Sequence, residues 1–156
     1  MKIIICGSRQ FEDYQYLKEK CTDIISKEQY NNEIPSKDLE IVSGNNPRGA
    51  DWYGEKFSRD VLKKDAKLFP ADWTDMTPPV MVGQNYYGAY NKLAGMNRNT
   101  KMVDYASKYE NSICIAFDMG TKGTKDTVAK CKKAGVKTYQ FRLDKNNEWY
   151  LKVWNQ

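Results

Sequence analysis

The stretch that decides the fold is Lys2-Ile3-Ile4-Ile5-Cys6, followed directly by Gly7-Ser8-Arg9. A short run of β-branched residues that stops at a glycine turn is typical of a buried strand. Four further apolar runs continue this pattern along the chain, at Leu39–Val42, Ala66–Phe69, Ser112–Phe117 and Val136–Phe141. We therefore predict about five strands, of which the third is weak, and a short C-terminal edge strand over Trp149–Val153.

Segments with helical periodicity lie between these strands. Apolar residues recur at helical spacing from Tyr14 to Ile25, and Asp13 is the predicted N-cap of this helix. Asn46-Pro47 predicts the start of a second helix, a third is predicted over Ala94–Lys108, and Thr124 lies in a fourth. Strands that alternate with helices indicate an α/β fold, in which a mostly parallel sheet is flanked by helices on both faces.

Composition limits the classes of protein. The chain has 156 residues, the length of one domain, and its 25 basic and 20 acidic residues give a net charge of +5. It contains no histidine, which excludes Ser-His-Asp and Cys-His catalysis and argues against a zinc site. The four cysteines show no metal-binding spacing and are expected to be buried, reduced thiols. No signal peptide or apolar span is found, so we expect a cytoplasmic protein without membrane contact.

Glycine and anion-donating residues follow the predicted strands. In a parallel sheet with right-handed crossovers, the loops after the strands meet at one edge, where ligands bind. Glycine lets the backbone approach a ligand, arginine binds phosphate, and a helix N-terminus attracts anions. The candidate binding residues are Gly7, Ser8, Arg9, Ser43, Gly44, Arg48, Gly49, Ala50, Asp51, Asp72, Arg98, Asn99, Gly120, Thr121, Gly123 and Thr124.

The best candidate for a phosphate cradle is the loop Gly120–Thr124, because it combines glycines, threonines and a helix start. Its spacing is neither that of a Walker A loop nor that of a dinucleotide-binding loop. Arg98 and Asn99 are interpreted as a second pair of donors at a helix start. Trp73, which follows the third strand, is expected to pack against the protein rather than to stack on a ligand.

Five motifs in order resemble the YspA-like branch of the SLOG superfamily, which groups the Smf/DprA proteins with the LOG cytokinin-activating enzymes. The motifs are Cys6-Gly7-Ser8-Arg9, Ser43-Gly44 with Arg48-Gly49-Ala50-Asp51, Phe69-Pro70-Ala71-Asp72-Trp73, Ala94-Gly95 with Arg98-Asn99, and Gly120 with Gly123-Thr124. The resemblance implies a Rossmann-like sheet and one nucleotide-binding domain over residues 1–156. The version with a long excursion, here residues 70–93, resembles those of phages and mobile elements.

The chain departs from this family at a residue that matters for catalysis. The LOG enzymes carry a glutamate that supports cleavage of the base–ribose bond, and Thr127 stands at that position here. Asp126 lies one residue earlier, which moves it about 100° around a helix. The resemblance therefore implies a binding site, and leaves open whether the protein cleaves any bond.

These observations predict a protein that binds a nucleotide or nucleotide-derived phosphate, as a sensor or a sequestering protein in conflicts between bacteria and phages. Three alternatives stay open: an N-glycosidase of nucleoside monophosphates that uses Asp51, Asp72 or Asp118, a single-stranded nucleic-acid binder, and an assembly subunit without a working site. No cofactor other than the nucleotide ligand is expected, and a homo-oligomer is compatible with the sequence. The tyrosines of the excursion predict either a lid over the base or a packing or oligomer-contact loop.

Overall fold

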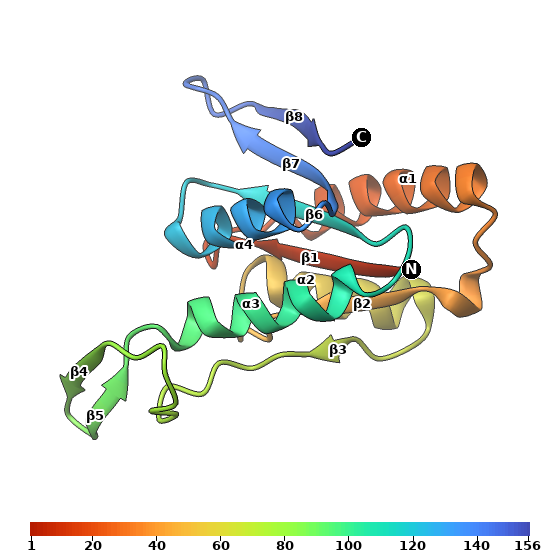
Figure 1. Ribbon diagram of the computed structural model, residues 1–156. Helices are drawn as coiled ribbons and strands as arrows, with labels where there is room; N and C mark the ends of the chain where they lie inside the picture. Colours follow the sequence, from red (N-terminus) through yellow and green to blue (C-terminus); the bar gives the residue numbers. More distant parts are fainter.

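The computed structural model describes all 156 residues, and its centre is a six-stranded sheet with the order β3-β2-β1-β6-β7-β8 (Figure 1). The strands are β1 (Lys2–Gly7), β2 (Glu40–Ser43), β3 (Lys67–Leu68), β6 (Ile113–Asp118), β7 (Lys137–Leu143) and β8 (Trp149–Trp154). The first five are parallel, and β8 runs antiparallel to β7 at the edge. The predicted α/β fold and its C-terminal edge strand are confirmed.

Two helices cover each face of the sheet. The helices are α1 (Tyr14–Asn32), α2 (Ala50–Phe57), α3 (Ala94–Ser107) and α4 (Lys122–Lys133), with a 3-10 turn at Ser36–Asp38 and a π-helical turn at Ser58–Leu62 after α2. Alternating side chains of β1 divide the core. Ile3 and Ile5 pack with α1 and α2 on one face, and Ile4 and Cys6 pack with α3 and α4 on the other. Both faces are thus buried, which explains the continuous apolar runs.

The four cysteines are buried and reduced, as predicted. The Sγ atoms of Cys6 and Cys114 lie 3.9 Å apart on neighbouring strands, within the core of the α3 and α4 face. The predicted N-cap of α1 is also correct, because the Asp13 carboxylate accepts a hydrogen bond from the Tyr16 N–H at 3.0 Å. No helix is long and apolar enough to cross a lipid bilayer.

The second helix begins later than predicted. Asn46-Pro47 was expected to open it, but α2 begins at Ala50 with Gly49 as its N-cap. The reason is a contact between loops: the Ala50 N–H donates to Ser8 O at 3.2 Å, so the loop after β1 takes up the first helical donor. Gly49 has a φ of +79°, which turns the chain sharply there.

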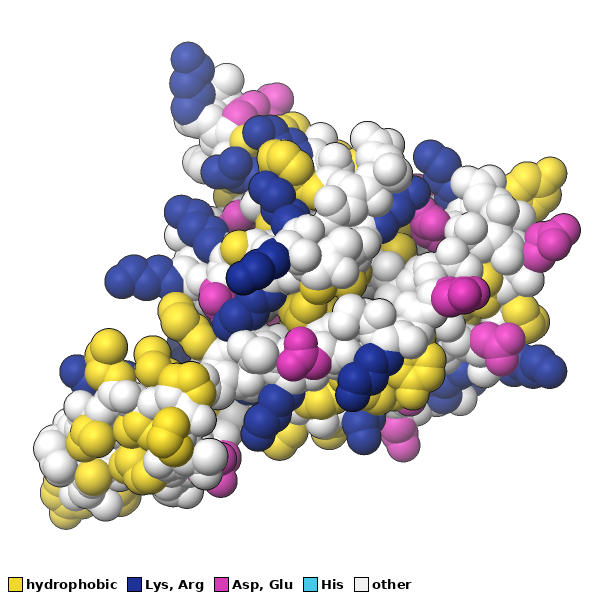
Figure 2. Space-filling view, in the orientation of Figure 1, with side chains coloured by type: hydrophobic (Ala, Val, Ile, Leu, Met, Phe, Trp, Pro, Cys, Tyr) yellow, Lys and Arg dark blue, Asp and Glu magenta, His cyan; other side chains and the backbone are white.

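The excursion over residues 70–93 is not a loop throughout, because it contains a β-hairpin. Strand β4 (Val82–Asn85) pairs antiparallel with β5 (Gly88–Asn91), and Figure 1 shows the pair extending beyond the N-terminal end of α3, away from the sheet. Tyr86 and Tyr87 at its tip are 95% and 92% exposed, and Figure 2 shows a group of hydrophobic side chains on this projection. Neither tyrosine lines the cavity described below, so the structure does not place them as a lid.

Candidate functional site

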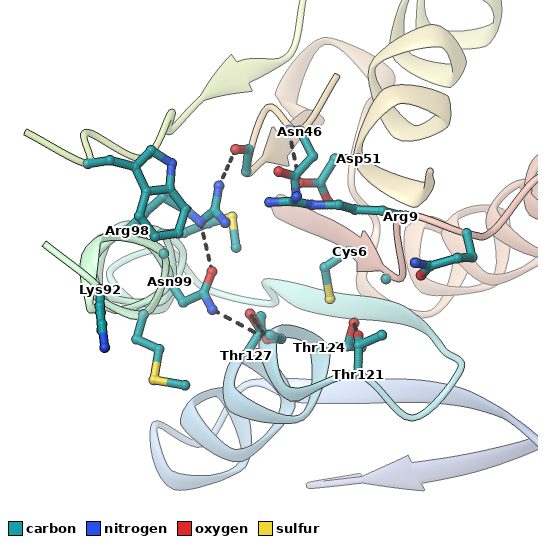
Figure 3. Close-up of a pocket in the computed structure, with 18 residues that line it drawn as sticks. Cys6, Arg9, Asn46, Asp51, Lys92, Arg98, Asn99, Thr121, Thr124 and Thr127 are labelled. Atoms are coloured by element: carbon teal, nitrogen blue, oxygen red, sulfur yellow. Dashed lines mark hydrogen bonds between the residues drawn. The ribbon is translucent and has the colours of Figure 1, made fainter. Parts of the chain in front are cut away.

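A cavity of 370 Å³ lies at the carboxyl ends of β1 and β6, where the strand order reverses (Figure 3). After β1, the strands β2 and β3 are added on one side of β1, and the chain then crosses to place β6 on the other side of β1. The loops after β1 and β6 lead to helices on opposite faces, which leaves a crevice between them. The lining residues are Cys6, Gly7, Arg9, Gln10, Gly44, Asn46, Asp51, Trp73, Lys92, Gly95, Met96, Arg98, Asn99, Met102, Thr121, Gly123, Thr124 and Thr127.

The N-terminus of α4 forms one wall of this cavity. Thr121 is its N-cap, and the first helical hydrogen bond runs from the Lys125 N–H to Thr121 O at 3.1 Å. The N–H groups of Lys122, Gly123 and Thr124 therefore have no partner within the helix. Apart from its chain neighbours and the backbone of its own helix, a Cβ atom at Gly123 would meet no protein atom within 4 Å, so the helix surface is open to a ligand at this point.

Hydroxyl groups fix the loop that leads into α4. Thr121 Oγ1 lies 3.0 Å from Thr124 Oγ1 and 3.3 Å from Ser8 Oγ, and the Ser8 hydroxyl also accepts the Met119 N–H at 3.2 Å. Ser8 is 1% exposed and does not line the cavity. The structure thus places this predicted binding residue between the loops after β1 and β6, where it joins them.

Asp51 is a buried carboxylate in the opposite wall. It is 4% exposed, and its Oδ2 accepts the Asn46 N–H at 3.2 Å. Burial raises the pKa of Asp51 to about 6, although the Asn46 hydrogen bond and the charge of Arg98 act in the other direction. A carboxylate in this environment can accept hydrogen bonds from a ligand's hydroxyl groups, or carry a proton near neutral pH.

Arg98 and Asn99 do not lie at a helix start. They lie in the second turn of α3, and most of their donors bind the protein. The Arg98 guanidinium donates to Gly44 O and, at 2.8 Å, to Asn99 Oδ1. The Asn99 amide donates to Gly123 O at 3.3 Å and to Asp126 Oδ2 at 3.1 Å. Both residues line the cavity, but their hydrogen bonds connect α3 with the end of β2 and with α4. Among the side-chain nitrogen atoms of Arg98 and Asn99, only Arg98 Nη2 has no hydrogen-bond partner.

Two exposed cations complete the cavity lining. Arg9 enters from the loop after β1, and Lys92 from the segment before α3 (Figure 3). Arg48 does not line the cavity, because it lies in the exposed loop ahead of Gly49. Of the three predicted arginines, the structure therefore brings Arg9 and Arg98 together, and leaves Arg48 outside.

Nine of the sixteen predicted residues line the cavity: Gly7, Arg9, Gly44, Asp51, Arg98, Asn99, Thr121, Gly123 and Thr124. The other seven are Ser8, Ser43, Arg48, Gly49, Ala50, Asp72 and Gly120. Ser43 is buried and donates to Glu55 Oε2 at 2.7 Å, and Asp72 lines a separate cavity of 160 Å³. Gly49 and Ala50 pack against the loop after β1, while Gly120 lies in an exposed turn.

The sequence did not identify every residue of the cavity. Trp73, expected to pack, lines it instead and is 42% exposed. Met96 and Met102 lie on α3 and were not among the predicted site residues, and Cys6 on β1 was predicted only as a buried thiol. Thr127 also lines the cavity, but its hydroxyl donates to Gly123 O at 3.2 Å within α4. Asp118, a candidate base, is buried outside the cavity, where it accepts the Gly120 N–H and the Gln140 amide.

No group of three or more acidic or cysteine side chains is arranged to hold a metal ion. Comparison with models of known protein families gives no match, and neither the curated proteins nor the solved structures contain one. The resemblance to the SLOG superfamily therefore stays a prediction from the sequence motifs.

Proposed function

We propose that this protein binds a nucleotide or nucleotide-derived phosphate in the cavity at the carboxyl edge of the sheet, as a sensor or a sequestering protein. One observation carries the proposal. The N-terminus of α4, with three N–H groups that lack a helical partner, opens into a cavity that also contains Arg9 and the buried Asp51. This combination suits a ligand with both a phosphate and hydroxyl groups.

The cavity offers a hydrogen-bonding group for each polar part of such a ligand. The phosphate accepts hydrogen bonds from the Gly123 and Thr124 N–H groups, with a charge-assisted hydrogen bond from Arg9. The ribose hydroxyls donate to Asp51 across the cavity. The cavity volume of 370 Å³ lies at the lower end of the range of about 300–1,000 Å³ for small-molecule sites, which favours a mononucleotide over a larger dinucleotide.

Isothermal titration calorimetry with AMP, ribose 5-phosphate and adenosine tests this proposal. AMP and ribose 5-phosphate are expected to bind, and adenosine more weakly than AMP by about tenfold or more, because it lacks the phosphate. Arg9→Ala should weaken AMP binding, whereas Lys145→Ala, an exposed cation in the turn before β8, should not. If adenosine binds as tightly as AMP, or if none of the three compounds binds, the proposal is wrong.

The N-glycosidase is a second candidate function, and one observation favours it. Asp51 lies in the cavity and has a pKa of about 6, close to the range in which a carboxyl group serves as a general acid or base. Chromatography of AMP incubated with the protein tests this candidate. Release of adenine in proportion to protein, lost in Asp51→Asn, would support it, and no release above the blank would contradict it.

Membership of the SLOG superfamily, a cytoplasmic location and a role in conflicts between bacteria and phages are parts of the same proposal. The order of the five sequence motifs supports the first and the last of these, the α/β fold agrees with the first, and the cytoplasmic location is an expectation from the sequence alone. A single-stranded nucleic-acid ligand has less support, because Figure 2 shows basic and acidic side chains interspersed on this face rather than a continuous basic groove.

A further inference from the structure

Trp73 differs from the other three tryptophans in having no partner for its ring. Trp149 stacks on Tyr16, Trp154 lies beneath Lys132, and Trp52 lies beside the Arg59 guanidinium. No aromatic ring or cation of the protein stacks on the indole of Trp73, although the indole lines the cavity and the Arg98 guanidinium lies near its edge. A large planar ring left open in this way provides a surface on which another planar group can stack.

The segment that carries Trp73 is ordered by its neighbours. The Trp73 carbonyl accepts the Asn91 N–H at 2.7 Å, which joins it to the base of the β4–β5 hairpin. One residue earlier, the Asp72 carboxylate accepts the Thr74 N–H at 3.0 Å and caps the turn. The excursion thus holds the indole at the cavity, while its tyrosines lie elsewhere.

Gly95 lets the edge of this ring lie close to the first turn of α3. A Cβ atom at Gly95 would lie 3.6 Å from Trp73 Cη2 and 3.9 Å from Arg98 Nη2, which are ordinary van der Waals distances. The first turn of α3 therefore has no side chain between the indole and the guanidinium. Trp73, Met96 and Met102 are three of the four hydrophobic residues in a lining that is otherwise mostly polar.

We propose that Trp73 is the stacking platform for the aromatic base of the ligand, because its partly exposed indole lines the cavity and no ring or cation of the protein stacks on it. This inference rests on the proposed function, and it adds that the protein recognises a nucleotide through its base as well as its phosphate. The α4 N-terminus binds the phosphate on one wall, and the base lies against Trp73 and Met96 near α3. A sugar phosphate without a base satisfies only the first of these contacts.

Calorimetry with the four common nucleoside monophosphates and with ribose 5-phosphate tests the inference. At least one nucleotide should bind the wild-type protein roughly tenfold or more tightly than ribose 5-phosphate, in line with the strength of base–aromatic stacking. Trp73→Ala should remove this preference and leave ribose 5-phosphate binding unchanged, whereas Trp73→Phe should keep most of it. Gly95→Leu should also remove the preference, because a Cβ atom at this position already contacts the indole and the larger side chain would displace or cover the ring.

Tryptophan fluorescence gives an independent readout. Binding of the preferred nucleotide should quench the emission of the wild-type protein and of Trp52→Phe, a matched change of an exposed tryptophan outside the cavity. Trp73→Phe should bind the nucleotide without that quenching.

The outcomes separate the two proposals. If a nucleotide is preferred over ribose 5-phosphate equally in the wild type and in Trp73→Ala, or if there is no preference at all, the inference is wrong while the proposed function stands. If neither ribose 5-phosphate nor any nucleotide binds the wild-type protein, the proposed function and the role of Trp73 as a stacking platform are both wrong.

Discussion

Gly49 and Gly123 belong to the same set of predicted binding glycines, but the chain needs them for different reasons. A Cβ atom at Gly49 would lie 2.4 Å from Ser8 O, and its φ of +79° disfavours any other residue. Gly123 lies in the first turn of α4, with nothing within 4 Å of such an atom. Glycine at 49 therefore permits two loops to pack, whereas glycine at 123 leaves the helix N-terminus open.

Alanine substitutions should separate these two roles. Gly49→Ala should lower the free energy of unfolding by about 2 kcal/mol or more, because of backbone strain and the clash with Ser8 O. Gly123→Ala should keep the stability or raise it by up to about 1 kcal/mol, since alanine favours a helix. The added methyl group should also weaken AMP binding by about tenfold, because it takes up part of the open space at the helix N-terminus where the phosphate is proposed to bind.

Urea denaturation and calorimetry measure both effects of these substitutions. Equal losses of stability in the two variants would contradict the assigned roles. AMP binding that is unchanged in Gly123→Ala would contradict the placement of the phosphate.

Asp51 should make stability depend on pH in an unusual direction. Its pKa is about 6 in the folded protein, against an ordinary value of 3.8 in the unfolded chain. Between these values the folded state holds a proton that the unfolded state releases, so the contribution of Asp51 to stability falls as the pH rises from about 4 to 6 and stays lower above that. The shift of about two units corresponds to a loss of about 3 kcal/mol.

Asp51→Asn should remove this loss. Its free energy of unfolding at pH 7 should exceed that of the wild type, and the difference between the two proteins should shrink towards pH 4. Urea denaturation of both proteins across this range checks the prediction, and Asp72→Asn, at an exposed position, is the control. A difference that does not change with pH would show that burial does not perturb Asp51.

At the scale of elements, the hairpin of the excursion depends on one buried side chain. Asn91 is 1% exposed, and its carboxamide accepts the Met81 and Leu93 N–H groups and donates to Asp75 O and Pro79 O. These four bonds hold the base of the hairpin, while its tip contacts solvent. Two strands of four residues have little stability of their own, so this anchor determines whether the hairpin stays ordered.

Asn91→Ala should release the hairpin without unfolding the sheet. Amide hydrogen exchange over residues 76–91 should become at least about tenfold faster, because four hydrogen bonds lose their side-chain partner. Exchange in β1 and β6 should not change. A Tyr86→Ser variant, altered only at the exposed tip, is the control and should exchange as the wild type does. Faster exchange throughout the chain would show that the hairpin and sheet unfold together.

The sequence predicted the elements of the sheet better than those of the excursion, for a physical reason. Residues of β1 and β6 are buried on both faces, so their apolar runs mark them directly. The hairpin strands contain Gly83, Gly88 and mostly exposed side chains, and their order comes from the contacts of Asn91 rather than from local pattern. The start of α2 was misplaced for a similar reason, because Ser8, more than forty residues earlier, binds its first N–H group.

The site could be predicted only as far as topology determines it. Parallel strands bring Gly7, Gly44 and Thr121 to one edge whatever the loops do, and these residues line the cavity. Whether Arg48 points into the cavity, or the Asn99 amide is free to bind a ligand, depends on side-chain packing that no local pattern encodes.

At the scale of the whole molecule, the two edges of the sheet differ in which helix ends they carry. The cavity proposed as the site lies at the carboxyl edge, beside the N-termini of α3 and α4. A second polar cavity, of 380 Å³, lies at the other edge beside the C-terminal ends of α1, α3 and α4. Helix N-termini attract anions and C-termini repel them, so similar volumes should differ strongly in phosphate binding.

The most direct measurement is an NMR titration of the ¹⁵N-labelled protein with AMP, read at each backbone amide. The largest shifts should occur at Gly123 and Thr124, with smaller shifts at Gly7 and Gly44 across the cavity and none at Asn111 or Gly135 at the opposite edge. Shifts concentrated at Asn111 and Gly135, or no shift at Gly123 and Thr124 at saturating AMP, would contradict a phosphate site at the N-terminus of α4.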